Sequence, residues 1–465
     1  MPRSIPVYSS RWLRAVEAER HYLAGVGAGD VVAVLLPNRI EIITTMYAAW
    51  ALGATLTPVN PALTDDEVRY QLEDSTTRAL VGNDRAGNLA RAQNISFVDV
   101  DSEQHRGEGV QMGVGRAIPG PDAHSAPALI VYTSGTTGRP KGCVLTHRNI
   151  DRMSAAIVTA CELGDADTSL LVLPLFHCNG LVVGTVAPLR AGGNVHVAPR
   201  FSPDTFWDNV ERVRPTYFSA VPTMYSLLAD RGPTDRDVSS LRFVICGAAP
   251  MPAGLIASFE STFHVPIVEG YGLSECTVAA TINPPSGLRK PGTVGIALPG
   301  VDIAIRTPDG PSTHPGRTGE VLVRGETVMQ GYLGLPEITD NTIRDGWLHT
   351  GDVGVVDSDG YLVLVDRLKD MIIRGGENIA PSEIEHVLQL HPDVLEAAVI
   401  GEEHPVYGEV PVAHVVARAG RTIFVDELEA HCERSLAKYK RPSRMVVHDA
   451  LPKNAVGKIA KKDLR

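Results

Sequence analysis

The first part of the chain alternates between buried-strand and helical patterns. Residues Val31 to Leu36 form a continuous apolar run that ends at Pro37, which is typical of a strand buried on both faces. Residues Ile40 to Leu52 then carry apolar side chains at helical spacing, and Gly53 ends this pattern. A short apolar segment, Ala54 to Pro58, follows at once. This order predicts a strand, a helix and a second strand.

The same alternation continues further along the chain. A helix is expected to begin at Thr64, because Glu67 stands three residues later in the spacing of a capping box. Further strands are expected at Ser169 to Leu173, Tyr217 to Ala220 and Phe243 to Cys246. Strands that alternate with helices favour a large α/β region with parallel sheets.

The pattern changes after about Pro291. Short β segments separated by glycine-containing turns predict a β-rich subdomain over about 291–366. From Met371 a small α+β unit is expected, with a helix over Pro381 to Leu390 and a strand over Ala397 to Ile400. The charged stretch DRLKD, Asp366 to Asp370, separates two apolar runs. We therefore predict a large N-terminal domain (1–366), a hinge (367–370) and a small C-terminal domain (371–465).

Composition and charge narrow the class of protein. The chain has 465 residues, 44% of them hydrophobic and 21% charged, which suits a globular protein of two or three domains. A formal net charge of -11 argues against a nucleic-acid-binding protein. The end of the chain is nevertheless basic: Arg434 to Arg465 contains ten Lys and Arg against two Asp, a net +8. Such a run is either a solvated surface or a segment that meets a polyanion.

Cysteine usage and the lack of long apolar runs predict a cytoplasmic protein without a membrane span. The six cysteines are scattered and form no C-x-x-C pair, so neither a disulfide framework nor a zinc site is expected. The first residues, MPRSIPVYSSRW, lack the apolar core of a secretion signal. No apolar run approaches the roughly 18 residues that a membrane helix needs.

The stretch Tyr132 to Gly142, YTSGTTGRPKG, carries the strongest chemical signal. Glycines, hydroxyls and free backbone N–H groups can close around a polyphosphate, and Lys141 adds positive charge. The spacing is not that of the common P-loop, and Gly142 stands where that loop has its magnesium-binding Ser or Thr. A metal ligand must therefore come from elsewhere in the chain.

Four other stretches supply matching chemistry. In EGYGLSE, Tyr271 can lie against a purine and Glu275 can supply the magnesium ligand. In HTGD, Asp352 can accept two hydrogen bonds from ribose hydroxyls. The stretch RGGEN forms a second glycine loop, and KNAVGK presents Lys458 in the basic tail. Each is weak alone, since an isolated HTGD is usually a turn and an isolated GK a solvated lysine.

Taken in order, these stretches resemble the adenylate-forming superfamily, in particular the AMP-dependent acyl-CoA synthetases and ligases. The resemblance runs from about Asp30 to Arg465 and rests on YTSGTTGRPKG, YGLSE, TGD, DRLKDMIIRGGENIAPSEIE and LPKNAVGKI. It implies parallel α/β sheets, a β-rich subdomain and a small C-terminal domain that moves about the hinge. It also implies ATP, Mg²⁺ and coenzyme A as cofactor and substrates, and a carboxylic acid as the group activated.

The resemblance also implies site residues. The β- and γ-phosphates would be held by Thr133, Ser134, Gly135, Thr136, Thr137, Gly138 and Lys141. The adenine site would be lined by Gly247, Ala248, Ala249, Tyr271 and Gly272. Ser274 would contact phosphate and Glu275 the magnesium ion, while Asp352 and Arg367 would bind the ribose hydroxyls. Lys458 would meet the reacting carboxylate, Lys369 would stand at the hinge, Gly375 and Gly376 at the pantetheine tunnel, and His177 at the acyl pocket.

These roles predict a carboxylate–CoA ligase that works in two steps. A carboxylate attacks the α-phosphorus of ATP and releases pyrophosphate, and a thiol then attacks the acyl-adenylate and releases AMP. Positive charge is needed where the two anions meet. The rotation of the small domain would exchange Lys458 for the glycine loop between the two steps.

Other readings remain open at this point. An adenylating enzyme could pass the activated group to a carrier-protein thiol, an amine or another small nucleophile. A catalytically inactive nucleotide-binding protein would be expected to lack Lys141, Glu275 or Lys458, and all three are present. The acyl site is expected to hold small or apolar residues without fixed charge, which favours an uncharged aryl or medium-length acid over a dicarboxylate. By position in the resemblance, these residues include His177, Cys178, Asn179, Leu181, Ser219, Ala248, Gly270, Val278 and Ala279. A monomer or homodimer without nucleic-acid or membrane partners is expected.

Overall fold

A computed structural model gives the fold. It describes residues 22–23, 25–102, 124–133, 139–247, 249, 251–368, 370–374, 377–453 and 459–464. The chain divides into two compact units, Met1–Ile303 with Val323–His349, and Ala304–Leu322 with Thr350–Arg465. The described residues of each unit are treated by themselves below.

The first sheet of the first unit is mainly parallel, as the apolar runs predict. Its strands are β1 (Val31–Leu35), β2 (Thr55–Pro58), β3 (Thr77–Gly82), β4 (Ser96–Asp99), β5 (Pro127–Thr133), β6 (Lys141–Thr146) and β17 (Gly331–Tyr332). They lie in the order β17-β6-β5-β2-β1-β3-β4, and β6 and β17 run antiparallel to their neighbours. All five residues of β1 are buried, which confirms the buried strand expected at Val31 to Leu36.

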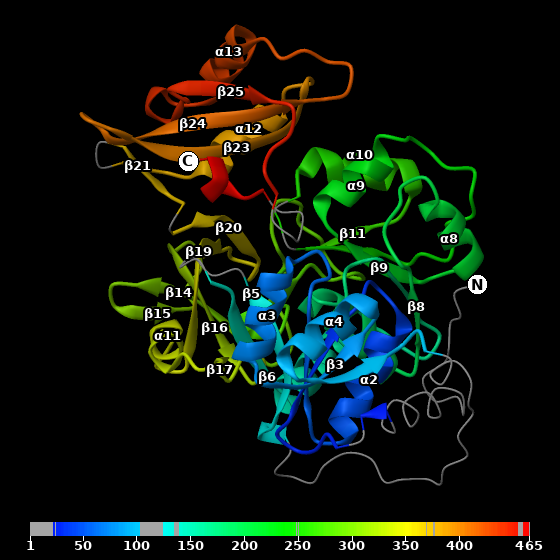
Figure 1. The fold of residues 1–465 in the computed structure, drawn as a ribbon. Helices are drawn as coiled ribbons and strands as arrows, with labels where there is room; N and C mark the ends of the chain where they lie inside the picture. Colours follow the sequence, from blue (N-terminus) through cyan, green and yellow to red (C-terminus); the bar gives the residue numbers. More distant parts are fainter. Residues whose placement is uncertain are drawn as a thin grey trace. The chain divides into compact units, whose positions relative to one another are not determined.

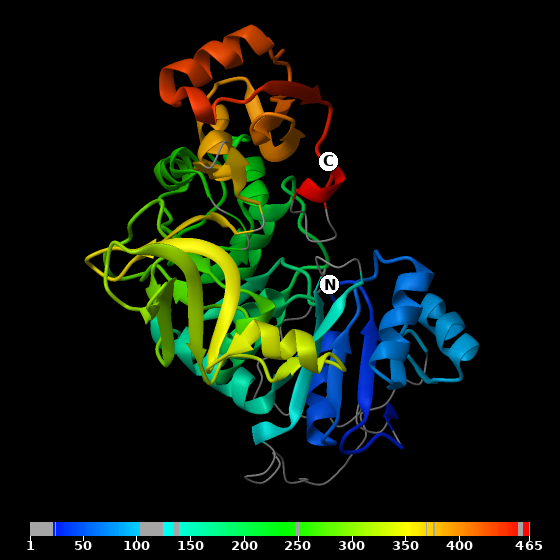
Figure 2. The ribbon, with the colours of Figure 1, turned by 90° about the vertical axis from the view of Figure 1, so that its left-hand side faces the viewer.

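Helices from the first part of the chain pack beside this sheet (Figure 1). They are α2 (Ile40–Ala51), α3 (Asp65–Asp74) and α4 (Asp84–Gln93). The capping box predicted at Thr64 is present: its hydroxyl accepts from the Glu67 amide, and the Glu67 carboxylate accepts from the Thr64 amide. Figure 2 shows α3 and α4 beside the strands that they contact.

The second sheet repeats this architecture. It contains β7 (Thr168–Leu171), β8 (Asn194–Val197), β9 (Tyr217–Ala220), β10 (Val244–Cys246), β11 (Ile267–Tyr271), β12 (Thr281–Ile282) and β13 (Ile296–Ala297). The order is β13-β12-β11-β10-β9-β7-β8, parallel from β11 to β8. The strands expected near 169, 217 and 243 are therefore confirmed.

Helices on one face of the second sheet close an aromatic core. The cluster joins Phe206, Trp207, Tyr225 and Phe259 from α8 (Phe206–Val213), α9 (Pro222–Ala229) and α10 (Ala253–Phe263) to the strand residues Phe218, Ala220, Val244, Cys246 and Ile267. The described part of this unit also contains the helices α6 (His147–Ala160), η2 (Asn179–Val186), α7 (Ala187–Arg190), η3 (Ser274–Cys276) and α11 (Pro336–Thr342). The η2 segment is a π-helix, which the apolar sequence LVVGTV did not reveal.

The third sheet contains antiparallel pairs of neighbouring strands, in agreement with the predicted β-rich subdomain. Its strands are β14 (Val301–Thr307), β15 (Gly310–Ser312), β16 (Thr318–Gly325), β18 (Ile343–Arg344), β19 (Trp347–Val356) and β20 (Leu362–Arg367). The chain passes from one compact unit to the other within β14, β16 and β19. The boundary predicted at 367–370 stays a prediction.

The last part of the chain forms a small α+β body. A sheet of β21 (Ile372–Arg374), β22 (Glu377–Ile379), β23 (Val394–His404), β24 (Gly408–Ala417) and β25 (Arg444–His448) packs against α12 (Pro381–Gln389) and α13 (Val425–Ser435). Two short 3₁₀ helices, η4 (Lys438–Lys440) and η5 (Lys461–Leu464), also belong to this body. The helix predicted at Pro381 and the strand predicted at Ala397 are both present.

Candidate active site

The phosphate-loop sequence joins two antiparallel strands. Thr133, the last residue of β5, pairs with Lys141, the first residue of β6, and its hydroxyl donates to the Lys141 carbonyl over 3.4 Å. The hairpin therefore fixes both ends of the loop. The predicted residues Ser134, Gly135, Thr136, Thr137 and Gly138 lie outside the described residues.

Glu275 lies in the short helix η3, next to this hairpin in the structure. The Tyr332 hydroxyl donates to Glu275 Oε1 over 2.6 Å, and the Lys141 Nζ atom lies 4.3 Å from the centre of the Tyr332 ring. Burial, followed by the nearby Glu275 charge, raises the pKa of Tyr332 well above its usual range, so its hydroxyl keeps its proton. Three residues thus bring a carboxylate, a phenol and an ammonium group together.

Backbone geometry holds Glu275 in place. Its carbonyl accepts from the Met329 amide over 2.8 Å, and the Cys143 thiol donates to the Ser274 carbonyl. Before it, a side chain at Gly272 would put Cβ 2.4 Å from the Val278 carbonyl oxygen, so the chain needs glycine there. After it, Thr277 and Val278 have φ angles of 65° and 122°. Such strained backbone is common at binding sites.

Tyr332 is the site residue that the sequence reasoning missed. It reaches the site because β17 pairs with β6, with Tyr332 opposite Cys143. Leu333 then donates its amide to the Gly142 carbonyl. The signal in the sequence was only an aromatic residue between two glycines, Gly331 and Gly334, which resembles an ordinary turn.

The predicted adenine segment lies at the ends of β10 and β11. Gly247 follows β10 and donates its amide to the Ala220 carbonyl over 3.4 Å, while Tyr271 ends β11 and is 8% exposed. A Cβ at Gly247 would lie 3.6 Å from the Gly270 carbonyl oxygen, so the two strand ends approach each other closely. Ala249 is exposed, and Ala248 lies outside the described residues.

The predicted acyl-pocket segment precedes η2. Phe176 and His177 make an edge contact with ring centres 4.4 Å apart, and the His177 carbonyl accepts from the Leu181 amide. Burial raises the pKa of the Cys178 thiol to about 12, with Ser274 and Glu275 among the groups that act on it. This segment therefore lies close to the loop that carries Glu275.

The two predicted ribose ligands are paired in the second unit. Asp352 and Arg367 lie opposite each other on β19 and β20, and Arg367 Nε is 2.9 Å from Asp352 Oδ1. The Asp352 side chain is 8% exposed, whereas that of Arg367 is half exposed. The Thr350 hydroxyl accepts from the Asp352 amide and donates to the Val321 carbonyl, which fixes this turn.

Several predicted site residues cannot be placed. Lys369, Gly375, Gly376 and Lys458 lie outside the described residues. Their roles, like the roles of the residues that are placed, stay predictions.

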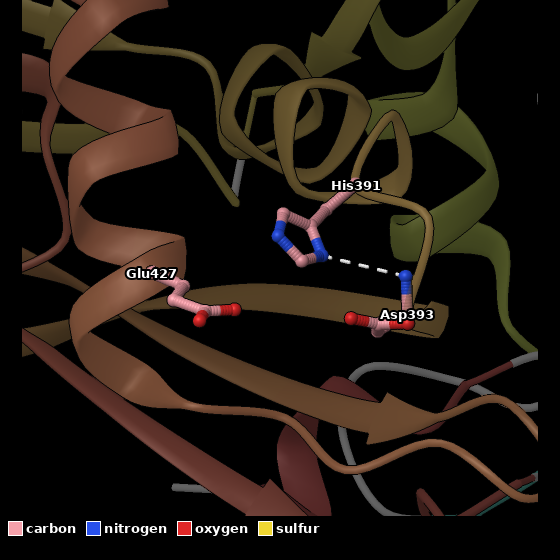
Figure 3. Close-up of side chains that lie close together, drawn as sticks. All are labelled: His391, Asp393 and Glu427. Carbon is pink, nitrogen blue, oxygen red and sulfur yellow. Dashed lines mark hydrogen bonds between the residues drawn. The ribbon is translucent and has the colours of Figure 1, made fainter.

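One set of possible metal ligands lies elsewhere, in the C-terminal body. Ligand atoms of His391, Asp393 and Glu427 lie within 4.8 Å of one another (Figure 3). The His391 Nδ1 atom accepts from the Asp393 amide over 3.4 Å, and Arg421 pairs with the Asp393 carboxylate. Because the amide and the guanidinium already engage these groups, we assign no metal to this set.

Comparison with known proteins decides the family. Residues 18–333 match the AMP-binding enzyme family, and residues 383–458 match the AMP-binding enzyme C-terminal domain. The chain belongs to the AMP-binding enzymes. This confirms the resemblance on which the sequence analysis relied.

Curated and structural relatives cover nearly the whole chain of this AMP-binding enzyme. The oxalate–CoA ligase of Arabidopsis thaliana is 36% identical over 94% of this chain and 88% of its own length. The feruloyl-CoA synthase of an Amycolatopsis species is 37% identical over 95% and 89%. The o-succinylbenzoate CoA synthetase of Bacillus subtilis, solved with its acyl-adenylate intermediate, has a TM-score of 0.88 at 32% identity over 97% and 92%.

The activity predicted from the sequence is confirmed at the level of the reaction. The chain is an AMP-forming acid–thiol ligase that uses ATP, Mg²⁺ and coenzyme A and acts through an acyl-adenylate. Among the described residues, no helix is both long and apolar enough to cross a membrane.

Proposed function

We propose that this ligase activates a carboxylic acid that carries no charged group besides the reacting carboxylate (an uncharged acid below), at a site organised around Glu275. The observation that carries the proposal is the arrangement of Glu275, Tyr332 and Lys141 at the base of the phosphate loop. A carboxylate bonded to the phenol hydroxyl and an ammonium group over the phenol ring suit a metal-bound polyphosphate, which needs both an acidic ligand and positive charge.

Glu275 fits a magnesium ion. Tyr332 engages Oε1 and leaves Oε2 without a hydrogen-bond partner among the described residues, and carboxylate oxygen is the ligand type that magnesium prefers. When bound, the ion would neutralise phosphate charge. The residues themselves orient the nucleotide: the loop 133–138 and Lys141 would hold the phosphates, and Ser274 would contact them.

The nucleoside and the reacting carboxylate require further groups. Tyr271 would stack on adenine beside Gly247, and Asp352 would accept hydrogen bonds from the ribose hydroxyls, with Arg367 beside it. Lys458 would offset the repulsion between the acid and the α-phosphate and stabilise the charge that develops during transfer. His177 would border the acyl group.

The second half-reaction needs a thiol at the same carbonyl carbon. We propose that Gly375 and Gly376 border the path of the pantetheine arm and that the chain turns about Lys369 between the two steps. The thiolate attacks the acyl carbonyl, the bond to the phosphate oxygen breaks, and AMP leaves.

The residues around the predicted acyl pocket bear on which class of acid is activated. Relatives act on acids as different as oxalate, ferulate and indoleacetate. The segments that border the pocket, Asn179–Val186, Tyr217–Ala220 and Val244–Cys246, contain no Lys or Arg. A second carboxylate on the acid would be left without a partner there, so we favour an uncharged aryl or medium-length acyl group.

A screen of pyrophosphate release tests this proposal. The enzyme is supplied with ATP, Mg²⁺ and a panel of mono- and dicarboxylic acids, with and without coenzyme A. We expect release with uncharged acids and faster turnover when coenzyme A is present. Activation of dicarboxylates alone would contradict the substrate class, and turnover unaffected by coenzyme A would favour another acceptor.

We further propose that the enzyme works in the cytoplasm as a monomer or homodimer.

A further inference from the structure

Two buried polar atoms border the predicted acyl pocket without a hydrogen-bond partner among the described residues. They are Oδ1 of Asn179 and Oγ of Ser219. Ser219 is 6% exposed. A buried polar atom without a partner destabilises the folded protein, and a site that binds a polar ligand supplies one reason to keep it.

Ser219 points to the face of the second sheet that η2 covers. Its strand neighbours Phe218 and Ala220 belong to the core cluster on the other face, beneath α8, α9 and α10. Successive strand residues alternate in direction, so Ser219 shares its face with Tyr217. The Tyr217 hydroxyl donates to the Val183 carbonyl within η2, over 2.9 Å.

Asn179 faces the same region from the opposite side. It begins η2, and a Cβ placed on Gly247 would lie 3.9 Å from its Nδ2 atom. The start of η2 approaches the preceding chain so closely that only glycine fits at position 180, because a Cβ on Gly180 would lie 2.5 Å from the Pro174 carbonyl oxygen. π-helical segments often occur at functional sites.

The strand position that approaches Asn179 is a glycine, Gly247. Ser219 lies opposite Ile245 on β10, and Gly247 follows two residues later on the same face. The carbonyl oxygen of Gly270, near the end of β11, would lie 3.6 Å from a Cβ on Gly247. A Cβ at Gly247 would already be in van der Waals contact with Asn179 Nδ2, so glycine keeps side-chain atoms away from Asn179 at this position.

The side chains of Asn179 and Ser219 favour a neutral hydrogen-bonding group on the ligand. Asn179 offers a carbonyl oxygen that only accepts, and Ser219 offers a hydroxyl that accepts or donates. The segments η2, β9, β10 and β11 contain no Lys or Arg. An anionic substituent would therefore meet no compensating charge from them, whereas a hydroxyl or an N–H group would satisfy both side chains.

We propose that Asn179 and Ser219 determine specificity by binding a hydroxyl or N–H group on the acyl part of the acid. The inference rests on the proposed function and narrows its substrate class from uncharged acids to uncharged acids that carry a hydrogen-bond donor. A site built to pair with a hydroxyl discriminates strongly against the analogue that lacks it, because its own polar groups then stay buried and unpaired.

The test compares matched acids. ATP–pyrophosphate exchange is measured with 4-hydroxycinnamate against cinnamate, 4-hydroxybenzoate against benzoate, and 4-hydroxyphenylacetate against phenylacetate. In the natural enzyme we expect kcat/KM to favour the hydroxylated member of at least one pair by about 10- to 100-fold. Ser219→Ala and Asn179→Leu should each reduce this ratio by about 10-fold, mainly through the hydroxylated acid.

A stability measurement separates specificity from structure. Because Ser219→Ala removes an unpaired buried hydroxyl, its melting temperature should equal or exceed that of the natural enzyme. Thr45→Val is the matched control: its hydroxyl is also buried without a partner, but it lies on α2 beside the first sheet, so the ratio should not change. If Asn179→Leu does not fold, Ser219→Ala alone decides.

Three results would overturn the inference. They are equal use of both members of every pair, an unchanged ratio in the folded variants, and a lowered melting temperature of Ser219→Ala with an unchanged ratio. A different result, no exchange with any acid, would overturn the proposed function and this inference with it.

Discussion

Replacement of Tyr332 by Phe tests whether this residue holds Glu275 for the metal. The variant loses the 2.6 Å hydrogen bond to Glu275 Oε1 but keeps the ring that lies 4.3 Å from Lys141 Nζ. A bond of this length to a carboxylate is charge-assisted, and such bonds contribute about 1.5–3 kcal/mol. Because Glu275 is only half-buried, we take the lower part of this range, about 1.5–2 kcal/mol.

This energy sets the size of the effect. At about 1.4 kcal/mol per factor of ten, the Mg²⁺ concentration that half-saturates pyrophosphate exchange should rise about 10- to 30-fold. The assay is ATP–pyrophosphate exchange at a saturating acid concentration over a Mg²⁺ series. The maximal rate at saturating Mg²⁺ should fall much less, because the carboxylate itself remains.

Tyr132→Phe is a matched control. The Tyr132 hydroxyl also donates to a carboxylate, Asp74 Oδ2 at 2.7 Å, but that pair does not include Glu275. Its Mg²⁺ dependence should equal that of the natural enzyme. An unchanged Mg²⁺ dependence in Tyr332→Phe, or an equal shift in both variants, would refute the role assigned to Tyr332.

Three further predictions concern stability, chemistry and motion. Burial raises the pKa of Glu269 from 4.5 to about 7. The folded protein therefore keeps a proton that the unfolded chain loses, so the free energy of unfolding falls as the pH rises from about 4.5 to 7. In urea titrations, Glu269→Gln should lose this pH dependence and gain on the order of 1–3 kcal/mol of stability at pH 8. A pH dependence equal to that of the natural enzyme would contradict this prediction. Lys458→Ala should slow adenylate formation by on the order of 10²–10³ while conversion of a supplied acyl-adenylate continues, and equal losses in both steps would show the assignment to be wrong. Lys369→Pro should slow one half-reaction far more than the other, because proline fixes φ at the predicted hinge. Proportional loss of both half-reactions in a folded variant would argue against a hinge. Unchanged rates of both half-reactions would show that Lys369 is a solvated linker residue.

Local signals in the sequence were sufficient for much of the fold. Pro37 and Gly53 delimit the strand and helix that the structure shows as β1 and α2, because both residues restrict or free the backbone whatever surrounds them. The Thr64 capping box needs only residues three apart, and it is present. The order of the motifs along the chain then indicated the family.

Contacts between distant residues were not predictable in the same way. Tyr332 and Glu275 are 57 residues apart, and they meet only because a two-residue strand returns from the β-rich region to the first sheet. The π-helix η2 has an apolar sequence that suits a strand or a buried helix equally well. The unpaired state of Ser219 depends on how η2 crosses the second sheet, which no local pattern encodes.

The fate of the carboxylate oxygens tests the central claim most directly. The acid is supplied with both carboxylate oxygens labelled with ¹⁸O, together with ATP, Mg²⁺ and coenzyme A. The products are separated and their masses are measured by mass spectrometry. Attack of the carboxylate on the α-phosphorus forms a carbon–oxygen–phosphorus bridge, and the thiol later breaks the carbon–oxygen bond. The account therefore predicts AMP with one ¹⁸O atom, unlabelled pyrophosphate, and a thioester that keeps the other ¹⁸O. Label in inorganic phosphate accompanied by ADP, or AMP without label, would contradict it.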